Sequence, residues 1–458
     1  MGYEMLRVYI IALTSAVLLL GAVIPEREAR AQLSVPDVRR GLPDLRELEI
    51  ERRVRRDVDD AVEKSSDAVD ETLAVTVDAT ALPLAEQLAQ QADAALENAT
   101  RAFIPDVDPR GYDIELDTVV VLIDTSRVGE LRHDSVTLLS RRDLPALGLT
   151  MLTLRKPAQG TLPDLVDELR TTWPDAVVDF NHLYTASVQA TGDIASMPSP
   201  APHAADVPAN ALRVGIIDSA VQKEHVMLQR SRVVSADFAM HDGERPLTHG
   251  TAVASIVATS SENRAVIYSA GVFFQLPGHA PGAATEGLVA ALAWLVDSDV
   301  PVINMSLSGP PNDLLEAVVQ RTVAQGHIVV AAVGNNGPSG APLYPGAYES
   351  VVGVTAVDHN RKVFRYANRG DHVDFAARGV NVRVADSESG GLRLESGTSM
   401  ASPHIAVVIA EFLSSQEVAA SAVRAWLIAG AEDLGRKGFD PVYGHGLITR
   451  PPVILSAD

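Results

Sequence analysis

Strands of the buried type alternate with amphipathic helices along the second half of the chain. Consecutive apolar residues occupy five strand-like segments: 212–217, 265–273, 300–307, 327–333 and 350–357. Apolar residues at helical spacing occupy three further segments: 249–258, 283–296 and 314–325. Near-continuous apolar strands that alternate with helices are typical of a parallel sheet covered on both faces. The pattern therefore predicts an α/β domain over residues 212–458, with helices on both faces of a parallel sheet.

A smaller α+β unit is predicted ahead of this domain, over residues 116–189. Its strand-like segments are 118–123, 149–154 and 176–184, and its helix-like segment is 162–173. Residues 190–211 then place prolines among alanine and serine. This composition is typical of an exposed linker that a protease can cut.

The N-terminal region carries a targeting signal rather than a folding pattern. Residues 1–31 combine a basic residue, an apolar run and the small-x-small motif Ala29-Arg30-Ala31, which is the pattern of a secretory signal peptide. A retained membrane anchor is the alternative interpretation. Residues 32–115 are rich in charge and then in alanine, which predicts a helical or disordered spacer that ends in a proline-marked linker at 105–111.

Composition narrows the classes of function. The 458 residues include 38 basic and 59 acidic side chains, a formal net charge of -21, which argues against nucleic acid as a partner. The chain has no cysteine, which excludes disulfides, thiolate metal sites and a cysteine nucleophile. Because 47% of the residues are hydrophobic, the chain can bury at least one large core.

Candidate chemistry lies at strand ends and helix starts of the predicted α/β domain. Asp218 ends the first strand, His249 opens the first helix, and Asn335 follows a later strand. Ser399 lies in a Gly-Thr-Ser turn at the predicted start of an apolar helix. Each residue alone is explained as a turn or helix-cap residue. Active sites of parallel sheets lie beyond the C-terminal ends of the strands, so together the four predict one site.

Chain order makes this prediction more specific, because Asp, His and Ser follow one another as they do in subtilisin. Five segments, in order, resemble the characteristic blocks of the subtilisin-like (subtilase) serine proteases: 214–218, 249–254, 303–309, 331–335 and 397–404. The resemblance covers residues 212–458, and the unit at 116–189 is more loosely similar to the inhibitory propeptide of such enzymes. It implies an exported serine endopeptidase that is made as a zymogen.

The resemblance also implies a role for each motif residue. Ser399 is the expected nucleophile, His249 the general base and then acid, and Asp218 the carboxylate that orients the imidazole. The Asn335 side chain and the Ser399 backbone N–H are expected to form an oxyanion hole. Residues 306–309 are expected to pair with extended substrate, and position 343 to line an uncharged specificity pocket. The expected substrate-binding residues are Ser306, Leu307, Ser308, Gly309 and Leu343.

Four positions depart from the family motifs: Ser219, Ala220, Ala252 and Arg378. These departures motivate an alternative hypothesis, a catalytically weak or inactive subtilisin-like protein that binds or regulates a partner. No acidic cluster resembles a strong calcium loop, so we expect no required cofactor and no metal ligands, and structural calcium has no clear motif to support it.

Partners and location follow from the same resemblance. Polypeptide substrates are the expected partners, with the chain's own propeptide-like unit as an intramolecular inhibitor. The signal segment predicts a secreted or periplasmic bacterial protein. A membrane-anchored enzyme, with residues 32–115 as its stalk, is the alternative if the N-terminal segment is retained.

Overall fold

The computed structural model describes residues 103–131, 133, 135–186, 189–194, 211–275, 280–415 and 419–449. The predictions for the signal segment and for residues 32–102 of the spacer lie outside these residues. Among the described helices, none is both long enough and apolar enough to cross a bilayer.

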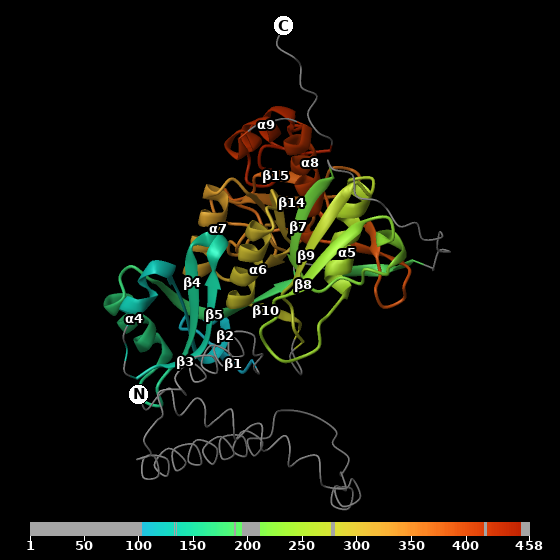
Figure 1. Cartoon of the computed structure of the whole chain (residues 1–458). Coiled ribbons are helices and arrows are strands. Elements are labelled where there is room, and N and C mark those ends of the chain that lie inside the picture. The colour runs from blue at the N-terminus through green and yellow to red at the C-terminus, as the bar shows by residue number, and fades with distance from the viewer. Residues whose placement is uncertain are drawn as a thin grey trace, which may run out of the picture. The chain divides into compact units, whose positions relative to one another are not determined.

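A seven-stranded parallel sheet is the centre of the α/β domain (Figure 1). From edge to edge its strands are β15 (Phe375–Arg378), β14 (Val352–Val357), β13 (Ile328–Ala332), β11 (Val302–Met305), β7 (Leu212–Asp218), β9 (Ala265–Gly271) and β8 (Arg232–Asp237). Every neighbouring pair runs parallel. The predicted fold class is confirmed, because the apolar runs form strands that are buried on both faces.

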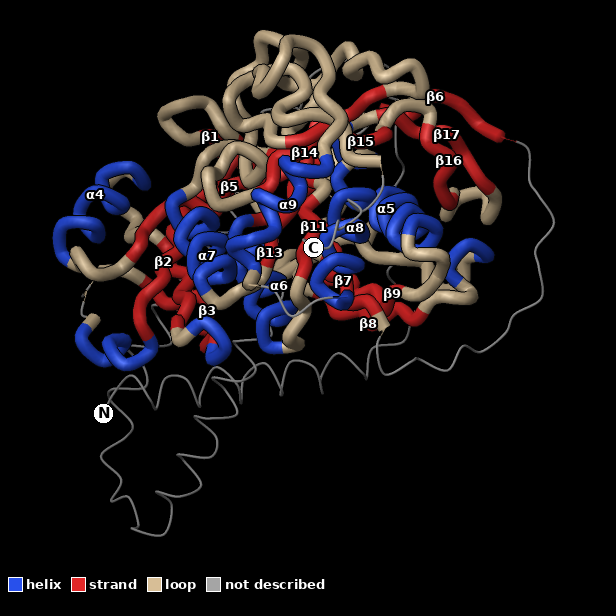
Figure 2. The backbone as a smooth tube through the Cα atoms, turned by 90° about the horizontal axis from the view of Figure 1, so that it is seen from above, coloured by secondary structure: helices blue, strands red, loops and turns tan. Residues whose placement is uncertain are grey.

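Helices cover both faces of this sheet (Figure 2). Helices α5 (Thr248–Ser260) and α8 (Ser402–Ser415) share one hydrophobic core with the strands. Helices α6 (Thr285–Asp297) and α7 (Asp313–Ala324) share the opposite core. A short helix, α9 (Val423–Gly430), follows α8 and packs onto the first core through Leu427.

The smaller unit is an antiparallel sheet with one helix. Its strands are β1 (Pro105–Val107), β2 (Asp113–Asp124), β3 (Thr137–Leu144), β4 (Leu149–Arg155) and β5 (Val177–Ala186), and its helix is α4 (Leu162–Thr172). Side chains alternate along β2 with the period of a strand. Val119 and Val121 pack with α4, whereas Val120 and Leu122 join the core that contains α6 and α7. The unit therefore packs directly onto the α/β domain.

Two segments differ from what their sequence suggested. Residues 105–107, within the stretch predicted as a linker, form β1 and pair with the start of β2. Residues 189–194 form β6 (Gln189–Ile194), which pairs with β17 (Leu392–Ser396) in a three-stranded sheet completed by β16 (Val382–Ala385). β1 gains its strand structure by pairing with the start of β2 a few residues later, and β6 by pairing with the distant β17. Local composition does not encode either pairing.

Candidate active site

Asp218 and His249 form a buried ion-pair arrangement at the C-terminal end of β7. Asp218 is the last residue of β7 and is fully buried, and its Oδ1 accepts a hydrogen bond from the Ser219 backbone N–H at 2.7 Å. The same oxygen lies 2.6 Å from His249 Nδ1. This contact places the proton on Nδ1, which leaves the lone pair on Nε2. Within the described residues, the buried Nε2 has no hydrogen-bond partner.

His249 is positioned by a close contact between the start of α5 and the loop after β7. The Gly250 N–H donates to Ser219 Oγ at 2.7 Å, and a Cβ on Gly250 would lie 2.1 Å from the Ser219 carbonyl oxygen. Only glycine allows the first turn of α5 to come this near to the loop after β7. Ser219 departs from the family motif, but its side chain still supplies the hydroxyl that accepts this hydrogen bond.

Ser399 lies in a short 3-10 turn, residues 398–400, between β17 and α8. The sequence predicted the start of the helix itself, but α8 begins at Ser402, next to Pro403, because proline fits only the first turn of a helix. Ser399 is fully buried, and its Oγ donates to the Ser306 carbonyl oxygen at 3.0 Å. The turn contacts α5, so the structure brings Ser399 beside the helix that carries His249.

Asn335 lies just beyond β13 and is oriented by the residue before Ser399. Its Oδ1 accepts hydrogen bonds from the Thr398 backbone N–H at 3.2 Å and from Thr398 Oγ1 at 3.3 Å. Thr398 Oγ1 in turn accepts from the Gly334 N–H at 3.1 Å. Since both contacts use the carboxamide oxygen, the Nδ2 donor is directed to the other side of the amide group.

Ser306 has a structural role that its sequence did not reveal. It is fully buried after β11, and its Oγ donates to the Ser399 carbonyl oxygen at 3.0 Å. It also accepts from Asn304 Nδ2 at 2.8 Å and lies 3.1 Å from Ser402 Oγ. Ser306 thus fixes the turn that contains Ser399 through hydrogen bonds to the residues on either end of that turn's connection to α8, Ser399 and Ser402. The available signal was a pair of polar residues, Asn304 and Ser306, at the end of an otherwise apolar strand.

The other predicted substrate-binding residues lie on an adjacent edge. Leu307 and Ser308 form the short strand β12 (Leu307–Ser308), and Gly309 pairs with Tyr344. Leu343 is half-buried against Gly334, where a Cβ would meet Leu343 Cδ1 at 2.5 Å. An aliphatic side chain therefore packs against Gly334, and the uncharged specificity pocket at Leu343 stays a prediction.

The profile described as the subtilase family matches residues 209–446, more than half of the chain. The chain belongs to the subtilase family. It is 34% identical over 249 residues to subtilisin DY of Bacillus licheniformis. The match covers 52% of this chain and 88% of that relative. It is 30% identical over 297 residues to subtilisin E of Bacillus subtilis strain 168. The match covers 62% of this chain and 76% of that relative. The chain is therefore a serine endopeptidase with polypeptide substrates, and a subtilase needs no cofactor for catalysis.

A solved structure supports the same fold for this subtilase. Fervidolysin from Fervidobacterium pennivorans, a keratinolytic enzyme related to subtilisin, matches with a TM-score of 0.58. The two sequences are 18% identical, and the match covers 77% of this chain and 62% of fervidolysin. At this identity the likeness concerns the arrangement of the backbone only.

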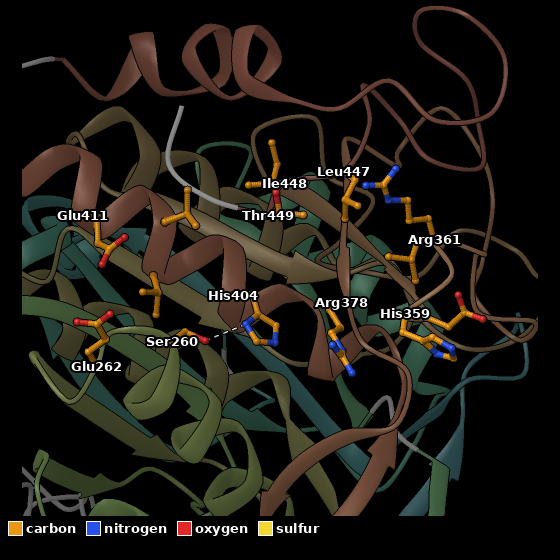
Figure 3. A pocket seen from close by; sticks show the side chains of 14 residues that line it. Ser260, Glu262, His359, Arg361, Arg378, His404, Glu411, Leu447, Ile448 and Thr449 are labelled. Atoms are coloured by element: carbon orange, nitrogen blue, oxygen red, sulfur yellow. Dashed lines mark hydrogen bonds between the residues drawn. The ribbon is translucent and has the colours of Figure 1, made fainter. Parts of the chain in front are cut away.

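A second histidine of the subtilase motif, His404, lies in a different environment. It borders a cavity of about 680 Å³ that is also lined by Ser260 and Arg378 (Figure 3). Its Nδ1 lies 2.8 Å from Ser260 Oγ, and burial, with a smaller effect of Arg378, lowers the pKa of His404 to about 4. The ring is thus neutral at pH 7 and engaged by Ser260, so of these two motif histidines it is His249 that is paired with a carboxylate.

Proposed function

We propose that Ser399, His249 and Asp218 carry out peptide hydrolysis through an acyl-enzyme. Ser399 Oγ attacks the scissile carbonyl carbon while its proton passes to His249 Nε2, and that proton then passes to the leaving amine. Water hydrolyses the acyl-enzyme by the same route. The 2.6 Å contact between Asp218 and His249, beside the turn of Ser399, is the observation that carries this proposal.

The serine hydroxyl must turn before it reacts. It donates to the Ser306 carbonyl oxygen in this structure, whereas His249 Nε2 is the acceptor that the chemistry requires. We infer that rotation about the Cα–Cβ bond of Ser399 moves the hydroxyl from one acceptor to the other. Hydrogen bonds between catalytic groups commonly tighten only when substrate is bound, so this geometry is compatible with a competent site.

Asn335 Nδ2 and the Ser399 backbone N–H are the proposed donors to the oxyanion. Asn335→Ala is expected to lower kcat by about 10²- to 10³-fold, a magnitude taken from the equivalent change in subtilisin, with KM almost unchanged. The donor acts mainly when negative charge develops on the substrate oxygen, so its loss raises the barrier more than it weakens binding. Steady-state kinetics on a peptide substrate measure this, with the exposed Asn360→Ala as the control. An unchanged kcat would remove Asn335 from the oxyanion hole.

We further propose that residues 103–186 are an inhibitory propeptide whose last strand occupies the substrate groove. The end of β5 lies between β12 and β10 (Gly282–Ala284) and pairs antiparallel with both. Thr185 is opposite Ser308 on one side and Gly282 on the other. This is the backbone pairing expected of an extended peptide bound to a strand edge. Thr185 and Ala186 also line a cavity of about 470 Å³ that contains His249.

Tyr184 anchors this strand. It is fully buried, and its hydroxyl donates to the Pro310 carbonyl oxygen at 2.9 Å. Its ring takes the space beside Gly309, where a Cβ would lie 2.4 Å from the ring. The glycine at position 309 therefore leaves room for a large side chain at this subsite, which supports the assignment of the 306–309 edge to substrate binding.

The proposed cleavage point lies between β5 and β6. Residues up to Ala186 pair with β12, and from Gln189 onward the chain pairs with β17, where Gln189 is opposite Ser396. Because β17 leads directly into the turn of Ser399, the last described residue of β5 and the first of β6 belong to strands on the two sides of the site. We therefore place the cleaved bond between Ala186 and Gln189. This point directly precedes the linker predicted at residues 190–211.

Processing tests the proposal directly. The wild-type chain is expected to yield a mature form that begins at residues 187–189, and Ser399→Ala is expected to remain a single uncut chain. N-terminal sequencing and intact mass measure both, with Ser414→Ala, an exposed serine on the following helix α8, as a control that should be processed normally. If Ser399→Ala is cut at the same bond at the wild-type rate, self-processing is wrong.

Export completes the proposed life cycle. Removal of residues 1–31 as a signal peptide would place the subtilase outside the cytoplasm, as a secreted or periplasmic enzyme. The first residue of the protein after translocation distinguishes this from a membrane-anchored enzyme: a start at Gln32 supports export, and retention of residues 1–31 supports the anchor.

A further inference from the structure

Three metal-ligating side chains meet in the buried interface between the propeptide-like unit and the α/β domain. Glu115 belongs to β2, Glu286 to the first turn of α6, and His241 to the loop between β8 and α5. Their exposed fractions are 3%, 0% and 0%. One atom from each lies within 4.8 Å of the other two, and sequence reasoning missed the group because its members are far apart along the chain.

The two carboxylates are held so that one oxygen of each faces the histidine. Asn181 Nδ2 donates to Glu115 Oε2 at 2.9 Å, and Thr153 Oγ1 donates to Glu286 Oε2 at 2.8 Å. The remaining oxygens, Oε1 of each glutamate, both lie 3.3 Å from His241 Nε2. Hydrogen bonds to the outer oxygens of this kind fix the orientation of metal ligands in known sites.

His241 does not form hydrogen bonds with these carboxylates. Its Nε2 is within ion-pair distance of both oxygens, yet among the described residues it has no partner of acceptable hydrogen-bond geometry. Charge-assisted N–H···O bonds are normally shorter, about 2.7–2.9 Å. By contrast, two ligands of one tetrahedral zinc ion, each about 2.1 Å from the metal, lie about 3.4 Å apart. The observed separations match ligands around a common ion better than a proton shared between the groups.

Two aromatic rings shield His241 from bulk solvent. The Phe103 and Phe274 rings flank the imidazole at centroid distances of 5.0 Å and 4.8 Å. An apolar shell around metal ligands limits access of water and lowers the local dielectric.

We propose that Glu115, His241 and Glu286 bind a divalent transition-metal ion of the zinc class. A mixed imidazole and carboxylate set suits zinc, whereas calcium and magnesium select oxygen ligands alone. A water molecule or a second carboxylate oxygen completes the four ligands. Because Glu115 lies on β2 and the other two ligands belong to the α/β domain, the ion fastens the propeptide-like unit to the catalytic domain.

This metal site does not depend on proteolytic activity. Its consequence for regulation does rest on the proposed processing: after cleavage, the ion would delay release of the propeptide, and a chelator would accelerate it. The experiment therefore uses the untagged full-length Ser399→Ala chain, confirmed by intact mass to be uncut, so that both parts are present and connected.

The test measures zinc binding and zinc-dependent stability. The chain is stripped with EDTA, dialysed against zinc, and analysed by elemental mass spectrometry and thermal unfolding. We expect one tightly bound zinc ion per chain and a higher Tm with zinc. Glu115→Gln is expected to weaken zinc affinity by about 100-fold or more, and Thr153→Val, which keeps all three ligands, by about 10- to 100-fold. His359→Ala, on an exposed histidine, controls for zinc held at the surface and should change nothing.

Two results would overturn the site. The first is a folded Ser399→Ala chain whose Tm does not respond to zinc. The second is a zinc content that Glu115→Gln leaves unchanged, since the ion would then be bound elsewhere. Comparing each variant with and without zinc separates loss of a ligand from a general effect on folding, because a general effect appears equally in both conditions.

Discussion

Ser399→Ala is expected to lose peptide hydrolysis almost completely, with kcat lower by on the order of 10⁶-fold. This magnitude is the one found when the nucleophile of subtilisin is removed. The change deletes only the Oγ atom that forms the acyl-enzyme, while Asp218 and His249 keep their 2.6 Å contact. Residual turnover would come from the oxyanion donors and from substrate binding. Turnover of a fluorogenic peptide, with KM measured in parallel, gives the result. Because Ser399→Ala is expected not to process itself, its propeptide is first cut by an added protease that is then removed.

A control separates chemistry from folding in this experiment. Ser399 Oγ also donates to the Ser306 carbonyl oxygen, so its removal leaves that buried acceptor with one contact fewer. The Tm of Ser399→Ala should therefore be compared with wild type, and Ser414→Ala should retain full activity. Turnover of Ser399→Ala within tenfold of wild type, in a sample free of other proteases, would contradict the nucleophile assignment.

Asp218→Ala is expected to lower kcat by on the order of 10⁴-fold, again by analogy with subtilisin. Asp218 Oδ1 accepts from both the Ser219 N–H and His249 Nδ1, so one oxygen fixes the tautomer and orientation of the imidazole. Its negative charge also stabilises the imidazolium that forms when Ser399 loses its proton. Both effects disappear in the variant, whereas groups that bind substrate are untouched, so KM should change little.

Asp218→Asn divides these two effects. Since a single oxygen accepts both hydrogen bonds, the asparagine can keep the oxygen in place and lose only the charge. Activity of Asp218→Asn close to that of Asp218→Ala would assign the effect mainly to charge. Asp371→Ala, an exposed aspartate, is the matched control and should retain wild-type kinetics. Wild-type kcat in both Asp218 variants would exclude Asp218 from catalysis.

The central strands were predictable because each is buried on both faces. The apolar runs at 212–217 and 327–333 correspond to β7 and β13 with small shifts at their ends. The edge strands β3 and β8 were not predicted, because their residues are mostly exposed or half-buried and show no apolar run. Burial on one side only weakens the hydrophobic signal on which sequence reasoning depends.

The site was predictable to the extent that it follows strand ends. Asp218 and Asn335 lie where β7 and β13 end, and motif order connected them with His249 and Ser399. The roles of Ser306 and Tyr184 were missed, because they arise from contacts between segments far apart in the chain. The same reason explains why the group of Glu115, His241 and Glu286 emerged only from the fold.

Reaction with a fluorophosphonate probe, followed by peptide mapping, tests the central claim most directly. The probe reports an activated serine whatever the natural substrate is. The account predicts a single adduct on Ser399 of the processed chain. It also predicts loss of this adduct in His249→Ala, which lacks the base, after the propeptide of that variant has been cut by an added protease. Absence of an adduct after confirmed removal of residues 103–186, or an adduct on another residue, would contradict it.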